Sequence, residues 1–159
     1  MYIIREAQTG DIAQVRELFL EYQSTLGVDL CFQGFAEELA SLPGNYARPA
    51  GRLLLASNAA SVVGVVALRP ILGADCEMKR LYVRAPGRGA GLGRLLTEAL
   101  IKEAQLAGYR RVLLDTLPSM TEAQALYRSI GFVEIPAYCH NPIAGTRYMA
   151  LELGSDKPA

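Results

Sequence analysis

The chain has 159 residues, of which 51% are hydrophobic and 20% are charged, as is usual for one soluble globular domain with a substantial core. Its 16 basic and 16 acidic residues cancel, so no net field attracts nucleic acid or an anionic membrane. Neither is predicted as a partner.

Targeting signals and metal-binding patterns are missing from the sequence. No apolar run approaches the ~20 residues that span a bilayer. The N-terminus lacks the basic start, apolar middle and small-residue cleavage site of a signal peptide. The three cysteines, Cys31, Cys76 and Cys139, are widely spaced and odd in number, which fits neither a disulfide framework nor a zinc site. The sequence therefore predicts a cytoplasmic protein without a bound metal.

Hydrophobic periodicity predicts strands and helices in the order β-α-α-β-β-β-α-β-α-β-β. Ten of these segments are a strand at 2–6, helices at 11–27 and 32–44, strands at 51–57, 62–71 and 76–83, a helix that starts at 92 and stops at Gly108, a strand at 109–116, a helix at 122–132 and a strand at 145–153. The eleventh is a strand between the helix at 122–132 and the last strand. This order predicts an α/β (α+β) fold, in which a central mixed, mostly antiparallel sheet has helices on both faces. Residues 1–153 are expected to form its single domain, and residues 154–159 a disordered tail.

The junction between the strand at 76–83 and the next helix contains four glycines: Gly87, Gly89, Gly91 and Gly93. Glycine at such a junction exposes backbone N–H groups, and a helix N-terminus attracts anionic oxygens, so a phosphate-binding loop is indicated. The spacing excludes a Walker A loop, because no Gly-Lys pair follows. It also excludes the G-x-G-x-x-G dinucleotide fingerprint, whose third glycine is absent in every register.

The segment Arg88-Gly89-Ala90-Gly91-Leu92-Gly93 resembles the R/Q-x-x-G-x-G/A loop of the GCN5-related N-acetyltransferase (GNAT) superfamily. In that family the loop binds the pyrophosphate of acetyl-coenzyme A. The physical reason does not depend on the family: consecutive amides at 89–94 can form an anion nest, the helix dipole adds a favourable field, and Arg94 adds charge. Arg84, Arg88 and Arg94 together make a local basic patch. Taken alone, the loop also fits a glycine-rich turn whose arginines are solvated.

A second segment strengthens the resemblance. Residues 125–132, "ALYRSIGF", resemble the family's alanine-and-tyrosine helix that ends in Gly-Phe, and Ala123 stands where the family usually has a small residue. The match covers most of residues 76–133. Met120 departs from the pattern, because the family often has an asparagine there that helps to hold the pantetheine arm. Those contacts are therefore expected from Ser119, Thr116 or backbone groups.

Ser119 has a second expected role, as the start of the helix at 122–132. The run Ser-Met-Thr-Glu at 119–122 matches a capping box, in which the serine bonds forward and Glu122 bonds back. The sequence therefore predicts that Ser119 caps this helix.

The resemblance assigns roles on the strand before the loop and on the second helix. In the family this strand splays from its neighbour, and its free backbone groups, here those of Leu81 and Val83, pair with pantetheine as another strand would. The amide of Leu81 is the candidate for polarising the thioester carbonyl. Tyr127 is the expected general acid, because a tyrosine keeps its proton at neutral pH and many family members use this position. A tyrosine that only packs is the alternative.

Transfer to an amine also requires a base, because a lysine-like amine with a pKa of about 10.4 arrives charged. Glu77 is the candidate, since its even spacing from Leu81 and Val83 places it on their face of the strand. Some histone-type members of the family have a glutamate at this place. A water chain as the base, or a purely structural glutamate, is the alternative.

The sequence leaves the acceptor open among amino acids, polyamines, antibiotics and protein lysines. In the family, the first two helices and the loop at 136–146 shape the acceptor pocket. Acidic residues of the first part of the chain, Glu21, Asp29, Glu37 and Glu38, either attract a cationic amine or form a solvated face. His140, the only histidine, is expected to be solvated or to line the pocket rather than to act as a base.

Together these features predict a GNAT-fold N-acetyltransferase that uses acetyl-coenzyme A. It is expected to acetylate a primary amine of a small molecule or peptide by direct transfer in a ternary complex. A non-catalytic acyl-coenzyme A-binding regulatory module is the alternative; Tyr127 argues against it and Met120 argues for it. Many family members dimerise, so a homodimer is compatible with the resemblance.

Overall fold

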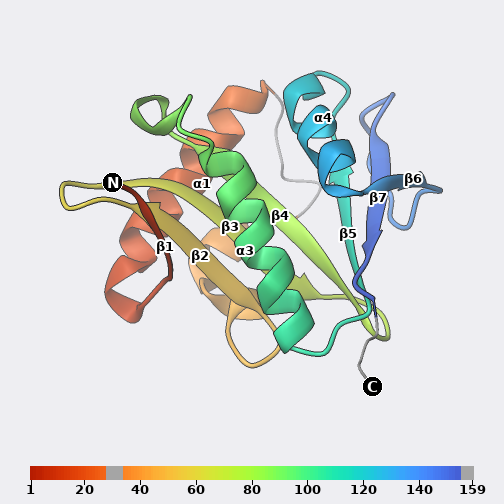
Figure 1. Cartoon of the computed structure of the whole chain (residues 1–159), viewed down its shortest axis with the longest axis horizontal. Helices are drawn as coiled ribbons and strands as arrows, with labels where there is room; N and C mark the ends of the chain where they lie inside the picture. The colour runs from red at the N-terminus through yellow and green to blue at the C-terminus, as the bar shows by residue number, and fades with distance from the viewer. Residues whose placement is uncertain (28–33, 155–159) are drawn as a thin grey trace.

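The computed structural model describes residues 1–27 and 34–154 and has a seven-stranded sheet at its centre, in the order β1-β2-β3-β4-β5-β7-β6 (Figure 1). The strands are Ile3–Glu6 (β1), Arg52–Ser57 (β2), Val62–Pro70 (β3), Asp75–Val83 (β4), Arg111–Thr116 (β5), Val133–Ile135 (β6) and Arg147–Glu152 (β7). Neighbouring strands pair antiparallel except β4 and β5, which run parallel. The predicted mixed, mostly antiparallel sheet is confirmed.

Helices cover both faces of the sheet, as predicted (Figure 1). They are Ile12–Leu26 (α1), Phe35–Ser41 (α2), Leu92–Leu106 (α3) and Thr121–Ile130 (α4), with 3₁₀ turns at Thr9–Asp11 (η1), Gly44–Tyr46 (η3) and Ala85–Gly87 (η4). One core lies between the sheet and the apolar stripes of α1 and α2, and the other contains the buried leucines of α3 together with α4. The alternation of side chains along β2, β3 and β4 supplies both cores.

A β-bulge in β4 interrupts that alternation. Val65 pairs with Tyr82 and Ala67 pairs with Lys79, so two residues of β4 oppose one residue of β3. Arg80, at the bulge, has φ of +64°, which is uncommon for a residue other than glycine. Its guanidinium donates to both carboxylate oxygens of Glu38 at 2.8 and 2.9 Å and lies over the rings of residues on α1 and α2. These contacts hold the bulge in place.

The start of α4 differs from the sequence prediction. The helix begins at Thr121, Met120 occupies the N-cap position without a side-chain bond, and Ser119 is exposed. Gln124 closes the turn instead, because its Nε2 donates to the carbonyl oxygen of Leu117 at 2.8 Å and its backbone N–H donates to that of Met120 at 3.0 Å. The predicted capping box is therefore wrong.

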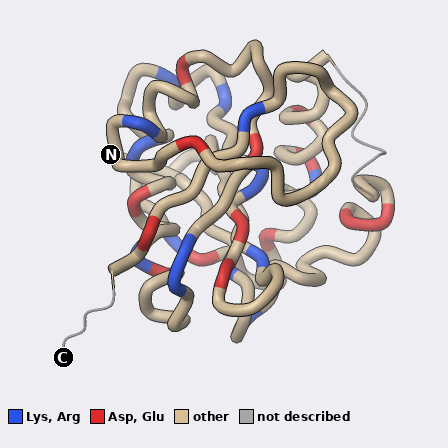
Figure 2. The backbone as a smooth tube through the Cα atoms, turned by 90° about the vertical axis from the view of Figure 1, so that its right-hand side faces the viewer, with Lys and Arg blue, Asp and Glu red and all other residues tan. Residues whose placement is uncertain are grey.

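Charged residues of both signs are interspersed along the backbone (Figure 2). None of the helices in the described part of the chain is long and apolar enough to cross a membrane. The tail predicted at 154–159 lies outside the described residues except for Gly154, and so do Cys31 and Asp29.

Candidate functional site

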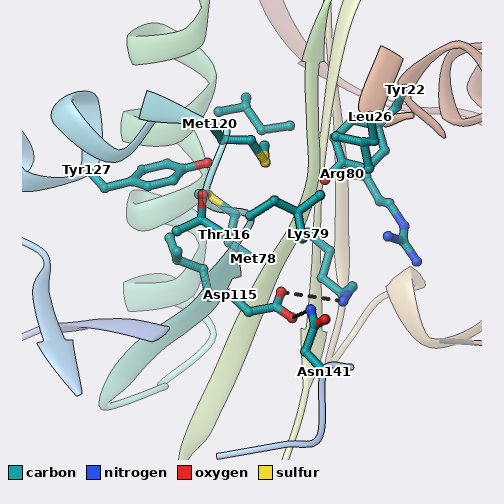
Figure 3. Close-up of a pocket in the computed structure, with 13 residues that line it drawn as sticks. Tyr22, Leu26, Met78, Lys79, Arg80, Asp115, Thr116, Met120, Tyr127 and Asn141 are labelled. Atoms are coloured by element: carbon teal, nitrogen blue, oxygen red, sulfur yellow. Dashed lines mark hydrogen bonds and ion pairs between the residues drawn. The ribbon is translucent and has the colours of Figure 1, made fainter. Parts of the chain in front are cut away.

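The site begins where β4 and β5 separate. Their parallel pairing is confined to Asp75–Glu77 on β4 and Arg111–Leu113 on β5, although β4 continues to Val83 and β5 to Thr116. A pocket opens beyond the last pair (Figure 3). It is lined by Tyr22, Leu26, Met78, Lys79, Arg80, Leu81, Leu114, Asp115, Thr116, Leu117, Met120, Tyr127 and Asn141. Since these residues come from α1, β4, β5, α4 and the loop before β7, the pocket connects the two faces of the sheet.

Two hydroxyl groups point into the pocket near Met120, those of Tyr127 and Thr116 (Figure 3). Tyr127 is 4% exposed, and its ring packs against Phe132 with the ring centroids 5.6 Å apart. Burial raises the pKa of Tyr127, so the hydroxyl keeps its proton at neutral pH. The Thr116 hydroxyl is buried and has no hydrogen-bond partner within the described chain. A buried hydroxyl without a partner is costly, and a ligand in the pocket would satisfy it.

Substitution of Thr116 by valine tests this assignment. Thr116→Val removes the unpaired hydroxyl while keeping the branched shape, so the free energy of unfolding should rise by about 1 kcal/mol. If the hydroxyl bonds to the cosubstrate, the dissociation constant of acetyl-coenzyme A should rise by about 3- to 10-fold, as expected for one hydrogen bond. Urea denaturation and calorimetric titration measure the two effects. A variant with unchanged affinity would remove Thr116 from the binding site.

The glycine loop is exposed at the N-terminus of α3. Gly89 and Gly91 have φ of +84° and +75°, a left-handed conformation that favours glycine, and a Cβ on either would meet no atom within 4 Å. Within the described chain, the backbone amides of residues 89–94 have no hydrogen-bond acceptor, whereas the Leu95 amide already donates to Gly91 at 3.1 Å. Free amides beside a helix N-terminus and open space for a ligand fit a pyrophosphate.

The predicted basic patch is only partly present. Arg84 is turned toward α1, where it forms an ion pair of 2.8 Å with Glu21, so its charge is already matched. Arg88 is exposed, and its Nε donates to the carbonyl oxygen of Val83 at 3.0 Å. Arg94 is also exposed; it bonds to a serine on α4 and forms a solvent-exposed ion pair of 3.4 Å with Glu98. Arg88 and Arg94 are therefore the cations that flank the open amides.

Glu77 lies on a different face from the one that the sequence predicts. The bulge at Arg80 reverses the alternation, so Leu81 packs on the α3 side whereas Glu77 faces the α1 and α2 side. Glu77 is 2% exposed, its Oε1 accepts from Arg69 at 2.9 Å, and its Oε2 accepts from the Tyr138 hydroxyl at 2.6 Å. The face prediction is wrong because even spacing implies a common face only in a strand without a bulge.

The environment of Glu77 predicts a large loss of stability on neutralisation. Glu77→Gln would leave the buried Lys79 and the partly buried Arg69 without their shared counter-charge, so the free energy of unfolding should fall by about 3 kcal/mol. For a chain of this size the melting temperature should fall by about 6–12 °C. Glu134→Gln is the control, since Glu134 also bonds to two arginines but is exposed, and it should melt close to the wild type. Equal melting temperatures for the two variants would contradict this account.

Of the residues that the sequence singled out for the acceptor, none in the described part of the chain lines the pocket. Glu21 and Glu38 are engaged by arginines, and the ion pair with Arg84 lowers the pKa of Glu21. Glu37 and His140 are exposed, and neither lines the pocket. Sequence reasoning missed a connected polar group from β4, β5 and the loop at 136–146: Lys79, Asp115, Tyr138 and Asn141.

The splayed parallel strands, the open amide loop and the buried tyrosine define an acyltransferase type of site, and comparisons with known proteins agree. The sequence model of the acetyltransferase (GNAT) family matches residues 12–132. An uncharacterized N-acetyltransferase of Schizosaccharomyces pombe is 41% identical over 145 residues, which are 90% of this chain and 89% of that protein.

Solved structures show the same fold. A GNAT-family acetyltransferase of Staphylococcus aureus Mu50 has a TM-score of 0.80 at 22% identity, and the match covers 96% of this chain and 99% of that one. YncA of Salmonella typhimurium, solved with its cofactor acetyl-coenzyme A, has a TM-score of 0.67 at 22% identity, and the match covers 99% of this chain and 96% of that one. The chain belongs to the GNAT acetyltransferase family. The predicted family, fold and enzyme class are confirmed, and the named N-acetyltransferase relatives favour an enzyme over the non-catalytic module.

Proposed function

We propose that this acetyltransferase moves the acetyl group of acetyl-coenzyme A to a primary amine of a small molecule or peptide, by direct transfer in a ternary complex. The observation that carries the proposal is the buried side chain of Tyr127, which lines the pocket between the separated strands and whose pKa is raised by burial. The pocket is bounded by α4 on one face of the sheet and by α1 on the other. Two substrates entering from opposite faces would meet there without a covalent enzyme intermediate.

The residues present fit acetyl-coenzyme A, which supplies an activated thioester when bound. The free amides of residues 89–94, with Arg88 and Arg94 beside them, would hold the pyrophosphate. Along the gap, the backbone of Leu81, the backbone N–H of Val83 and the unpaired hydroxyl of Thr116 would hold the pantetheine arm, while the Val83 carbonyl accepts from Arg88. Of the loop residues, Gly89, Ala90, Gly91 and Gly93 expose backbone rather than side chains to this ligand, while Ser119 lies exposed before α4.

Two proton positions matter for the transfer. Tyr127 Oη holds a proton near the gap and is the donor available to the sulfur that leaves. The proton of the amine must also be accepted. Because both carboxylate oxygens of Glu77 are already bonded, we propose that Glu77 acts through the polar group beside it or through water rather than by direct contact.

Thermal shift with acetyl-coenzyme A, ATP and NAD is the first test of this function, followed by release of free coenzyme A in the presence of amines. Ligand at about a hundred times its dissociation constant stabilises a fold by about 2.7 kcal/mol, or about 5–10 °C here. We expect that shift with acetyl-coenzyme A alone, and release that depends on an added amine. A shift with only ATP or NAD would overturn the assignment of the loop, and release independent of amines would overturn the amine acceptor.

A further inference from the structure

The cation Lys79 is the least satisfied charge in the pocket. Its side chain is 5% exposed, and its Nζ lies 3.9 Å from Glu77 Oε2 and 4.0 Å from Asp115 Oδ1, both beyond hydrogen-bond range. Within residues 1–27 and 34–154 it has no hydrogen-bond acceptor. An ammonium group has three donors, and in a side chain that is only 5% exposed little water is available to pair with them. Accordingly, burial lowers the pKa of Lys79, against the attraction of the two carboxylates.

The carboxylates next to Lys79, those of Glu77 and Asp115, accept hydrogen bonds from other groups instead. Glu77 accepts from Arg69 and Tyr138, as described above. Asp115 Oδ2 accepts from Asn141 Nδ2 at 3.2 Å. Figure 3 shows Lys79, Asp115 and Asn141 together on one side of the pocket and Tyr127 on the other. The donors of Lys79 and the remaining oxygen of Asp115 are therefore left for a ligand.

We propose that the acceptor is an amino carboxylate, and that Lys79 Nζ binds its carboxylate while Asp115 faces its amine. This inference rests on the proposed function and names the substrate class of the same site. A carboxylate would supply the negatively charged hydrogen-bond acceptors that the Lys79 ammonium group lacks here. Arg80, the other cation of the lining, is already paired with Glu38 through two bonds.

The charge balance favours a zwitterion over other acceptors. Arg69 and Lys79 offset Glu77 and Asp115 in this group, so a polyamine or a simple anion would leave a net charge inside the pocket. A compound with one amine and one carboxylate adds no net charge. Its two ends match Lys79 and Asp115, which are adjacent and opposite in sign.

Matched acceptors test the proposal. Each standard amino acid, together with 4-aminobutyrate and 6-aminohexanoate, is assayed beside its carboxamide, which keeps the amine and removes the negative charge. At least one free acid should have a kcat/KM ten or more times that of its carboxamide, as one charge-assisted contact allows. Wild-type enzyme that acetylates carboxamides as well as the acids would overturn the proposal without any variant. So would a panel of acids that is not acetylated while acetyl-coenzyme A binds.

Variants of Lys79 identify the residue responsible. Lys79→Met should bring the acid-to-carboxamide ratio of kcat/KM close to one, whereas Lys79→Arg should keep a preference for the acid because it keeps a cation. Lys102→Met removes an exposed lysine on α3 and should leave the ratio unchanged. Preserved discrimination in Lys79→Met would overturn the role of Lys79. If Lys79→Met does not fold, Lys79→Gln takes its place, and its acid-to-carboxamide ratio of kcat/KM should also fall close to one. A ratio that stays high in Lys79→Gln would equally overturn the proposal.

The same measurements separate this inference from the proposed function. If coenzyme A is released with carboxamides as acceptors but not with the free acids, the proposed acetyl transfer to an amine stands. The proposal that the acceptor is an amino carboxylate is then overturned. Conversely, a thermal shift with free acids that is lost in Lys79→Met, together with no shift from acetyl-coenzyme A, would support the site and remove the cosubstrate assignment.

Discussion

Tyr127→Phe should reduce kcat by about 100-fold, the lower end of the range for a lost general acid, while the affinity for acetyl-coenzyme A changes by less than about threefold. The hydroxyl is the only group removed, and the ring keeps its contact with Phe132. Steady-state kinetics at saturating amine, with a calorimetric titration of the cosubstrate, would measure the two quantities. Unchanged turnover would leave Tyr127 as a packing residue.

Tyr109→Phe is the matched control for this substitution. Tyr109 lies beyond the opposite end of β5, and its hydroxyl donates to the carbonyl oxygen of Ala50 at 2.6 Å, away from the pocket. The control should keep its kcat. The pH dependence gives a second check: burial raises the pKa of Tyr127, so its proton stays in place through the physiological range. Loss of kcat through ionisation of Tyr127 is therefore expected only above about pH 10.

The order of elements could be predicted because each segment carries its own periodicity. The leucine stripe of α3 and the apolar run of β5 are local patterns, and the pairing of β2 with β3 follows from the short turn between them. The glycine loop was also recognisable from its spacing, although Gly87 has another role. Gly87 is buried, and a Cβ there would lie 2.9 Å from side-chain atoms of Leu92 and Val63, so it serves packing rather than phosphate binding.

The face on which each side chain of β4 lies could not be predicted, because the bulge that decides it depends on a residue far away in the sequence. The bulge depends on Arg80 with a positive φ, and Glu38, which bonds to it, is on α2. No local pattern indicates such a pairing. The same holds for the start of α4, where the expected serine cap is replaced by a bond from Gln124 to Leu117 that exists only once the turn has formed.

The connected polar group of the pocket could not be predicted from the sequence, for a related reason. Lys79 and Asp115 are on different strands, and Tyr138 and Asn141 are in the loop before β7, so their proximity follows from the crossover that sets β5 beside β4. In the sequence, Lys79 stands in a strand that also contains Glu77 and Arg80, and nothing there indicates that its side chain is buried. Its burial is a signal of function only in retrospect, because a buried lysine needs a reason.

Gly91→Glu should weaken the binding of acetyl-coenzyme A by 100-fold or more. The new side chain would extend from a position with open space around it into the region where the amides of residues 89–94 face a pyrophosphate. Its negative charge would repel that group, and loss of two charge-assisted hydrogen bonds, at about 1.5–3 kcal/mol each, corresponds to that change. Thermal shift and calorimetric titration with acetyl-coenzyme A measure it.

Gly73→Glu is the matched control, because it separates the loss of the binding loop from backbone strain. Gly73 is exposed in the turn between β3 and β4 and has φ of +68°, and a Cβ added there would also meet no atom within 4 Å. Both variants place a glutamate in a left-handed conformation and should lose a similar amount of stability, about 1 kcal/mol. Only Gly91→Glu should lose affinity. If it bound acetyl-coenzyme A as tightly as Gly73→Glu, the open amides would not be the pyrophosphate site, and the charge of Arg88 and Arg94 would have to hold the cosubstrate without them.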